Sequence, residues 1–313
     1  MSDTNSAPIL IGYDGYDDAA AAIRLAGPLL PGRRAIVACV WNSFAATLLH
    51  SNVEGLTGAM KEAAEEFDAG ERERASELAE DGARLAREAG FEARPAAVLG
   101  KPKAWPSLLD LADEHGAAAI VVGSEGLGTV KSALIGSVSA GLLHHSRRPI
   151  LVVPRRTAED ANGPLVVGYD GSEHAGRAIE TAGSLFAGRE AIVETVWIPY
   201  TEVAAASGIA MPAAVSAEGA QKVDEELAAR AERSAEDGAG VAKAAGLEPR
   251  AEAIREHGNV SHTLIESARA NDAAAIVVGS RGRSGIATAL LGSVSTSLVH
   301  HTPVPLLVVP PPA

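Results

Sequence analysis

Short, continuous runs of apolar residues alternate along the chain with longer segments in which apolar residues recur every three or four positions. The short runs are rich in Val, Ile and Leu, which is typical of strands buried on both faces of a parallel sheet. The periodic segments are typical of amphipathic helices. In the first half of the chain, the pattern predicts strands at residues 9–13, 35–41, 93–99, 118–123 and 149–153.

This order of strands and helices occurs twice. PILIGYDGYDDA at Pro8 returns as PLVVGYDGSEHA at Pro164, and AAAIVVGSEGLGTVKSALIGSVS at Ala117 returns as AAAIVVGSRGRSGIATALLGSVS at Ala273. Both pairs lie 156 residues apart. Since two copies are too few for a solenoid, the repeat predicts two similar α/β domains, each with a five-stranded, parallel, doubly wound sheet. We place them at residues 1–155 and 163–313, on either side of a short polar stretch.

Between the expected strands, helices are predicted at residues 71–89, 104–115 and 137–145. The acidic, Arg-rich run from Glu62 to Arg87 should present a solvated helix face with i,i+4 ion pairs. Residues 42–70 and 198–219 have a weak pattern and are expected to be long connections, either lids over a ligand or simply mobile segments.

A glycine-rich loop follows the fourth strand of each half and leads into a helix. Glycine lets backbone N–H groups converge on an anion, and the N-terminus of a helix favours negative charge. Alternatively, the glycines only make turns and Ser137 and Ser293 are ordinary helix caps. The residues expected to contact a phosphate are Gly123, Gly126, Gly136, Ser137, Val138 and Ser139 in the first half, and Gly279, Arg281, Gly282, Gly292, Ser293, Val294 and Ser295 in the second.

The first strand of each half ends in a Gly-Tyr-Asp-Gly sequence, which contributes Gly12 and Asp14, then Gly168 and Asp170. A carboxylate at this end of a central strand could accept a hydrogen bond from a ribose hydroxyl or hold a phosphate-bound metal, and an Asp-Gly turn is the alternative interpretation. Neither a Walker loop nor the G-x-G-x-x-G pattern of dinucleotide folds is present.

Together, the G-x-x-G, nine-residue, G-[ST] spacing, the VGYDGS-type end of strand one and the closing PVPLLVV strand resemble the universal stress protein family, in its tandem-domain form. The resemblance implies Rossmann-like folds of the adenine nucleotide α-hydrolase type, ATP as ligand with Mg²⁺ or Mn²⁺ as possible companions, and pairing of the two domains through their last strands. It also implies that Val40 and Val196 meet the adenine through their backbones, and that Asp14 and Asp170 lie beside the ribose and phosphates.

The two copies differ near the expected ligand. Tyr16 stands where the second half has Ser172, and Glu125 stands where it has Arg281. A carboxylate in a phosphate loop repels the ligand, whereas Arg281 and the nearby Arg283 attract it. With only Lys131 to compensate in the first half, we expect the second site to bind more tightly and the first to be weak or empty.

Composition narrows the possible partners and location. A formal net charge of −13 argues against nucleic acid and anionic membranes as partners. The single cysteine, Cys39, cannot form an internal disulfide and is expected to be a small core residue. With a polar N-terminus and no apolar run of about 20 residues, the sequence predicts a cytoplasmic protein. The pairs His144–His145 and His300–His301 each end an expected helix, where they favour its dipole rather than a shared metal ion.

Three functions remain open at this point. The absence of a recognisable nucleophile–base pair favours a nucleotide-dependent sensor that acts through an unknown protein partner, with homo-oligomerisation possible. A slow ATP hydrolase or phosphotransferase is the alternative, with Asp14 or Asp170 positioning the metal ion and Arg281 or Lys131 stabilising charge. A nucleotide-free dimeric scaffold is the third.

Overall fold

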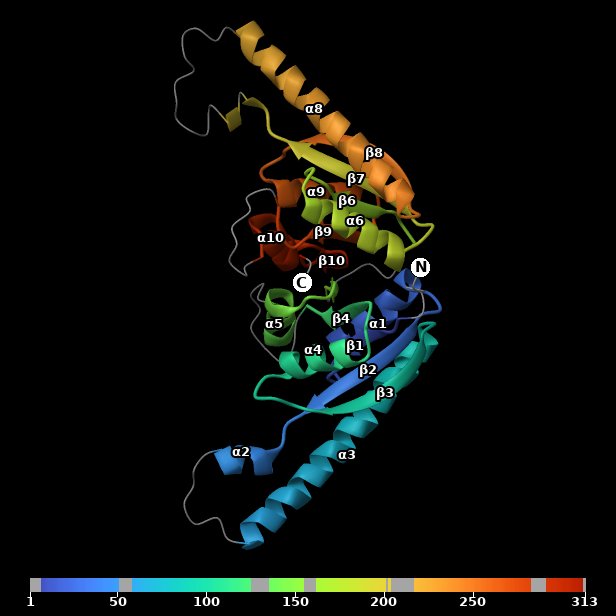
Figure 1. Ribbon diagram of the computed structural model, residues 1–313, viewed down its shortest axis with the longest axis vertical. Helices are drawn as coiled ribbons and strands as arrows, with labels where there is room; N and C mark the ends of the chain where they lie inside the picture. The colour runs from blue at the N-terminus through green and yellow to red at the C-terminus, as the bar shows by residue number, and fades with distance from the viewer. Residues whose placement is uncertain are drawn as a thin grey trace. The chain divides into compact units, whose positions relative to one another are not determined.

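The computed structural model describes residues 7–50, 58–124, 135–154, 162–200, 202–203, 217–282 and 291–311. Its internal contacts divide the chain into two compact units, residues 1–155 and 156–313. Each unit has its own set of strands and helices (Figure 1).

Each unit contains a five-stranded parallel sheet, which confirms the predicted fold class. In the first unit the order across the sheet is β3-β2-β1-β4-β5, and in the second it is β8-β7-β6-β9-β10. The strands of the first unit are β1 (Ile9–Gly12), β2 (Arg34–Trp41), β3 (Glu92–Leu99), β4 (Ala119–Gly123) and β5 (Ile150–Val153). Those of the second are β6 (Leu165–Gly168), β7 (Glu190–Trp197), β8 (Glu248–Arg255), β9 (Ala275–Gly279) and β10 (Leu306–Val309).

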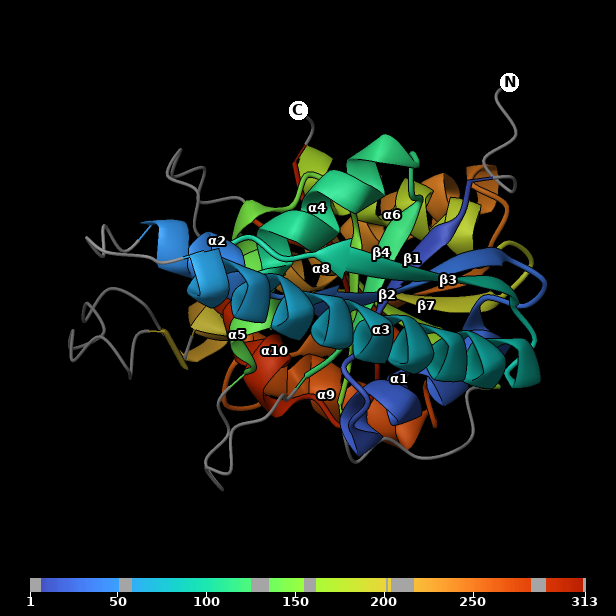
Figure 2. The same cartoon turned by 90° about the horizontal axis from the view of Figure 1, so that it is seen from below.

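Helices cover both faces of each sheet, which is why the central strands are continuous apolar runs. In the first unit α1 and α3 lie on one face of the sheet and α4 on the other (Figure 2), and α5 packs against α4. As a result Ile9, Leu10 and Ile11 of β1 are fully buried. The helices of this unit are α1 (Asp17–Leu29), α2 (Phe44–His50), α3 (Gly58–Glu88), α4 (Ala104–Glu114) and α5 (Ser137–His145). In the second unit they are α6 (Glu173–Leu185), α8 (Ala217–Ala244), α9 (Val260–Ala270) and α10 (Ser293–His301).

The prediction of a long connection at residues 42–70 is wrong. Residues 44–50 form α2, and α3 begins at Gly58, well before the expected start at residue 71. Gly70 suggested a break, but a glycine inside a helix costs only about 1 kcal/mol relative to alanine. The surrounding Ala, Glu, Lys and Met residues favour the helix and offset that cost. In the second unit, α8 likewise begins inside the segment predicted as a connection.

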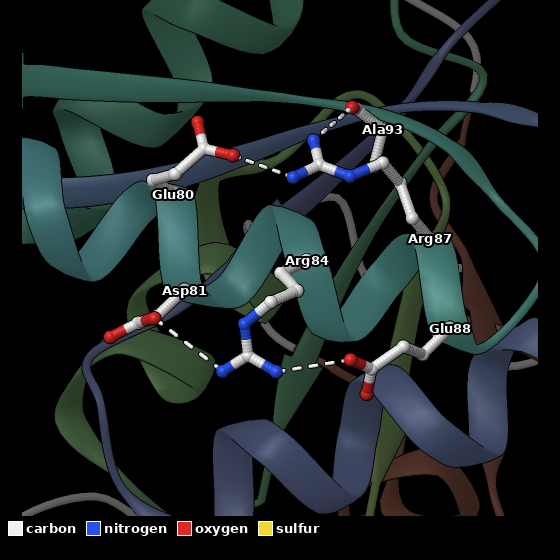
Figure 3. Close-up of polar contacts among 6 residues, drawn as sticks. All are labelled: Glu80, Asp81, Arg84, Arg87, Glu88 and Ala93. Atoms are coloured by element: carbon white, nitrogen blue, oxygen red, sulfur yellow. Dashed lines mark hydrogen bonds and ion pairs between the residues drawn. The ribbon is translucent and has the colours of Figure 1, made fainter.

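The C-terminal half of α3 carries the ion pairs predicted for a solvated helix (Figure 3). Arg84 lies 3.0 Å from Glu88 at i,i+4 and 3.5 Å from Asp81 at i,i+3. Arg87 pairs with Glu80 and donates a 3.0 Å hydrogen bond to the carbonyl of Ala93, which ties the helix to β3. Because these side chains are exposed, solvent screens the ion pairs and each contributes little to stability. Across the described residues, no helix is long and apolar enough to cross a membrane.

The histidine pairs lie where the sequence predicted them. His144 and His145 form the last turn of α5, and His300 and His301 form the last turn of α10. Within the described ranges, no group of three or more His, Cys, Asp or Glu residues is arranged to hold a metal ion. Cys39 is buried against Ala75 and Ala79 of α3, which confirms it as a core residue.

Candidate functional site

The candidate site lies at the carboxyl ends of β1 and β4. β1 pairs with β2 on one side and with β4 on the other, so the direction of winding reverses between β1 and β4. Crevices for ligands form at such points in open α/β sheets. In the first unit a cavity of about 260 Å³ opens there.

Most of the residues predicted for the first half meet in this cavity. Those that line it are Gly12, Asp14, Val40, Gly123, Gly136, Ser137, Val138 and Ser139. Gly126 lies outside the described residues, as do Glu125 and Lys131. Segments far apart in the sequence are therefore brought to one edge of the sheet.

The sequence analysis missed the apolar wall of the cavity. Ala38 on β2, Ala104 and Leu108 on α4, and Val122 on β4 also line it. Ala38 and Val40 alternate along β2 and so point to the same face, which is a signal that could have identified Ala38. The helical residues could not be assigned to the cavity without knowing which face α4 covers.

Contacts with β2 and α3 hold the turn after β1 in place. The backbone N–H of Tyr13 donates to the carbonyl of Ala38 over 2.9 Å. A Cβ added at Gly82 would lie 2.7 Å from the Tyr13 ring, so α3 can approach this closely only because it carries a glycine there. In the second unit Gly238 leaves the same 2.7 Å to the ring of Tyr169. The packed tyrosine fixes the position of the following aspartate in each unit.

Asp14 fits both interpretations that the sequence left open, a turn residue and a ligand contact. Its Oδ1 accepts a 3.2 Å hydrogen bond from the N–H of Tyr16, across a turn in which Gly15 has a φ of +84°. Asp14 also lines the cavity. Partial desolvation raises the pKa of its carboxyl above the ordinary value; the Tyr16 N–H opposes the rise and the Asp18 carboxylate adds to it. Asp170 repeats the turn, accepting from the N–H of Ser172 over 3.0 Å.

The helix caps differ from the prediction. Gly136, not Ser137, is the N-cap of α5, and Gly292, not Ser293, is the N-cap of α10. Neither cap makes a side-chain hydrogen bond. Each glycine instead donates its own N–H over 2.8 Å, to the carbonyls of Ser124 and Ser280 respectively, and this contact closes the base of the loop. The first turn of each helix is therefore left without a side-chain cap, which favours an external anion there.

Ser139 and Ser295 hold the start of these helices against the sheet. The Ser139 Oγ donates a 2.6 Å hydrogen bond to the carbonyl of Gly123, and the Ser295 Oγ donates a 2.8 Å bond to that of Gly279. Both serines are almost fully buried. Their hydroxyl protons are thus committed to positioning the glycine-rich loop.

In the second unit the corresponding segments also converge. A Cβ added at Gly282 would lie 3.0 Å from Asp170 Oδ2, and one added at Gly292 would lie 3.6 Å from the Cα of Arg281. Gly168 is the last residue of β6 and Val196 is the last but one of the neighbouring β7, and Ser293, Val294 and Ser295 open α10. Arg283 lies outside the described residues. The two units thus share the backbone arrangement of the site.

The side chains around it are not the same in the two units. Ser172 caps α6 by accepting a 3.2 Å hydrogen bond from Ala175, whereas Tyr16 makes no side-chain cap on α1 and its ring is 47% exposed. The tyrosine is not among the cavity residues, so it does not fill the first site. A buried Asp18 follows on α1, where α6 has His174.

Comparisons with known proteins agree with this architecture. A model of the universal stress protein family matches residues 6–154 and 162–310. Universal stress protein Rv2623 of Mycobacterium tuberculosis (strain ATCC 25618 / H37Rv) is 28% identical over 239 residues, 74% of each chain. A universal stress protein of Mycolicibacterium smegmatis is 29% identical over 201 residues, and the match spans 61% of each protein's length. The crystal structure of one from Archaeoglobus fulgidus DSM 4304 is 20% identical, covers 98% of both chains with a TM-score of 0.59, and shows the same fold.

Proposed function

Because the chain belongs to the universal stress protein family and carries two copies of its domain, we propose that it binds ATP and acts as a nucleotide-dependent regulator in stress adaptation. One observation carries the proposal. The cavity of the first unit brings together the Asp14 turn, the end of β2 and the uncapped start of α5. This combination offers a carboxylate, an apolar wall and free backbone donors, which suit the ribose, the base and the phosphates of a nucleotide.

The described residues fit each part of such a ligand. Val40, with Ala38 and Leu108 near it, forms an apolar wall against which a base can lie. The first turn of α5, which begins at Ser137, offers N–H groups to a phosphate. Asp14 is placed to accept a ribose hydroxyl or to meet a Mg²⁺ or Mn²⁺ ion carried by the phosphates.

In the second unit the backbone of Arg281 lies beside the corresponding glycines, and its side chain carries a positive charge that attracts a phosphate. We therefore propose that the second site holds ATP more tightly than the first. The regulatory step in this proposal is a change in the surface offered to a protein partner when ATP orders the glycine-rich loops. Pairing of the two units through their last strands, and assembly of several chains, belong to the same proposal.

Isothermal titration calorimetry of the full chain with ATP, with and without Mg²⁺, tests this function. The expected result is binding at one or two sites, with the tighter site lost in Gly292→Val/Ser293→Ala. The matched variant Gly136→Val/Ser137→Ala should remove only the weaker site. Circular dichroism of both variants shows whether they remain folded.

Two results would replace the proposal with another function. A chain that produces no heat with ATP under any condition is a nucleotide-free scaffold. Steady release of ADP in proportion to protein, lost in the same variants, would identify a slow ATP hydrolase instead.

A further inference from the structure

The second unit buries a carboxyl group at a place where the first unit has none. Glu194 lies in the middle of β7 and is 1% exposed. The residue at the same place in the repeat is Ala38, in an otherwise equivalent apolar strand. A charged group in such a position is costly unless it is paired or protonated.

Polar residues, most of them peculiar to the second unit, surround this carboxyl group. Ser267 of α9 donates its hydroxyl to Glu194 Oε1, and Asn271 donates to the Ser267 Oγ over 3.3 Å. The Arg250 guanidinium of β8 donates to Asn271 Oδ1 over 2.7 Å and pairs with Glu252. In the first unit the places of Ser267 and Glu252 are taken by Leu111 and Ala96.

The second oxygen of Glu194, Oε2, is buried and has no hydrogen-bond partner among the described residues. The charged groups that face the carboxyl are Arg250 and Glu252, both on β8, where Glu252 is the register partner of Glu194. From α9 it meets Ser267, and from β6 its register partner is Gly168. Burial raises the pKa of Glu194 to about 7, although the Ser267 hydroxyl and the Arg250 charge oppose the rise.

The strand that carries Glu194 also forms part of the candidate site. The carbonyl of Glu194 accepts a 2.8 Å hydrogen bond from the N–H of Tyr169, the residue before Asp170. Val196 follows two positions later on the same face of β7. A charge on Glu194 would therefore act on both the turn and the strand end that face the ligand.

We propose that Glu194 is a proton-responsive group beneath the second nucleotide site, so that acidification strengthens nucleotide binding in the second unit and not in the first. The ligand part of this inference rests on the proposed function. Protonation removes a negative charge from beneath an anionic ligand and removes the cost of burying that charge. By reciprocity, nucleotide binding to this site takes up protons near neutral pH.

The sign of the effect on stability follows from linkage. The pKa of Glu194 is raised above its ordinary value of 4.5 to about 7, so between these pH values the folded unit holds a proton that the unfolded chain has released. The contribution of Glu194 to the stability of the second unit is therefore greatest below pH 4.5, and it is lost as the pH rises through 7.

The first test needs no ligand. The chain has three tryptophans, and Trp41→Phe/Trp105→Phe leaves Trp197, at the end of β7, as the only one. Urea unfolding followed by its fluorescence should show a midpoint that falls between about pH 5.5 and 8.5. In the same background, Glu194→Gln and Glu194→Ala should both reduce the dependence of the midpoint on pH. The alanine variant introduces the residue that the first unit has at this place. A midpoint that does not change with pH, or that falls equally in all three chains, would overturn the proposal.

The second test measures the coupling to the ligand. ATP binding is measured calorimetrically for the full chain and for Glu194→Gln at pH 6 and pH 8. Protonation of ATP itself affects both chains equally, so the difference between them reports on Glu194. The affinity of the second site should fall between pH 6 and pH 8 by roughly threefold more in the natural chain than in the variant. An equal fall in the two chains would overturn the coupling. Absence of ATP binding at both pH values would instead refute the proposed function. The result of the unfolding test, which needs no ligand, would remain valid.

Discussion

At Gly82, helix α3 lies so close to β1 and β2 that one added methyl group has no room. A Cβ at this position would lie 2.7 Å from the Tyr13 ring and 2.8 Å from Val37. At Gly70, in the same helix, nothing lies within 4 Å of the corresponding position. The two glycines therefore have opposite energetic roles, although the sequence presents them alike.

Substitution of each glycine by alanine should separate these roles. Gly82→Ala should destabilise the first unit by about 1–3 kcal/mol because the helix must move away from the sheet. Gly70→Ala should instead stabilise it by about 0.5–1 kcal/mol through helix propensity alone. Urea unfolding followed by circular dichroism gives both values, and equal effects of the two substitutions would contradict the close approach.

Some residues of the candidate site could be predicted from the sequence, and the roles of others could not. The repeat itself identified Gly12, Asp14, Gly123 and Gly136, because both copies carry them at the same spacing. It could not show that Gly136 rather than Ser137 is the helix cap, since that depends on backbone angles. Glu194 was visible as a difference between the copies, but its significance depends on the burial that the fold imposes.

At the scale of elements, the strands were predictable and the start of the long helix was not. Runs such as Ile9–Gly12 and Ala119–Gly123 are too short and too β-branched for a helix. α3 extends past the sheet, as Figure 1 shows, so its first turns lack the apolar stripe by which a helix is recognised. α2 is only 7 residues long and is stabilised by a contact that sequence periodicity does not reveal.

That contact is a cap supplied by another helix. Asp68 of α3 accepts hydrogen bonds from the N–H groups of Phe44 at 2.6 Å and Ala45 at 3.3 Å, and from the Ser43 hydroxyl at 2.5 Å. In the second unit Asp224, at the same place in the repeat, accepts from the N–H of Tyr200. Each unit thus uses its long helix to hold the segment that follows its second strand.

Removal of the Asp68 cap should have a local effect. In Asp68→Ala, amide exchange of residues 43–47 should become about tenfold faster or more, because the lost cap is worth about 1 kcal/mol or more. The midpoint of global unfolding should barely change, since residues 44–47 of α2 are exposed or only partly buried. Hydrogen exchange with mass spectrometry measures both, with the exposed Arg74→Ala as control. Unchanged exchange at 43–47 would show that the cap does not stabilise α2.

For the whole molecule, the duplication creates two candidate sites that share a backbone arrangement and differ in charge. The first has Asp14 and Asp18 near the turn, whereas the second has Asp170, His174 and Arg281. In β7, which leads to the second candidate site, the buried Glu194 stands where the first unit has Ala38. In our account, the shared backbone supplies the capacity to bind a nucleotide and the differing side chains set two affinities and two responses to pH.

Native mass spectrometry of the full chain with increasing ATP counts the nucleotides on each molecule, and so tests whether each unit holds a nucleotide of its own. One ATP should bind first, and a second should follow at higher concentration. Gly292→Val/Ser293→Ala should eliminate the first of these and leave the weaker one. A chain that stays unliganded at every ATP concentration, or that keeps both nucleotides when Gly136 and Gly292 are each replaced by valine, would refute the two proposed sites.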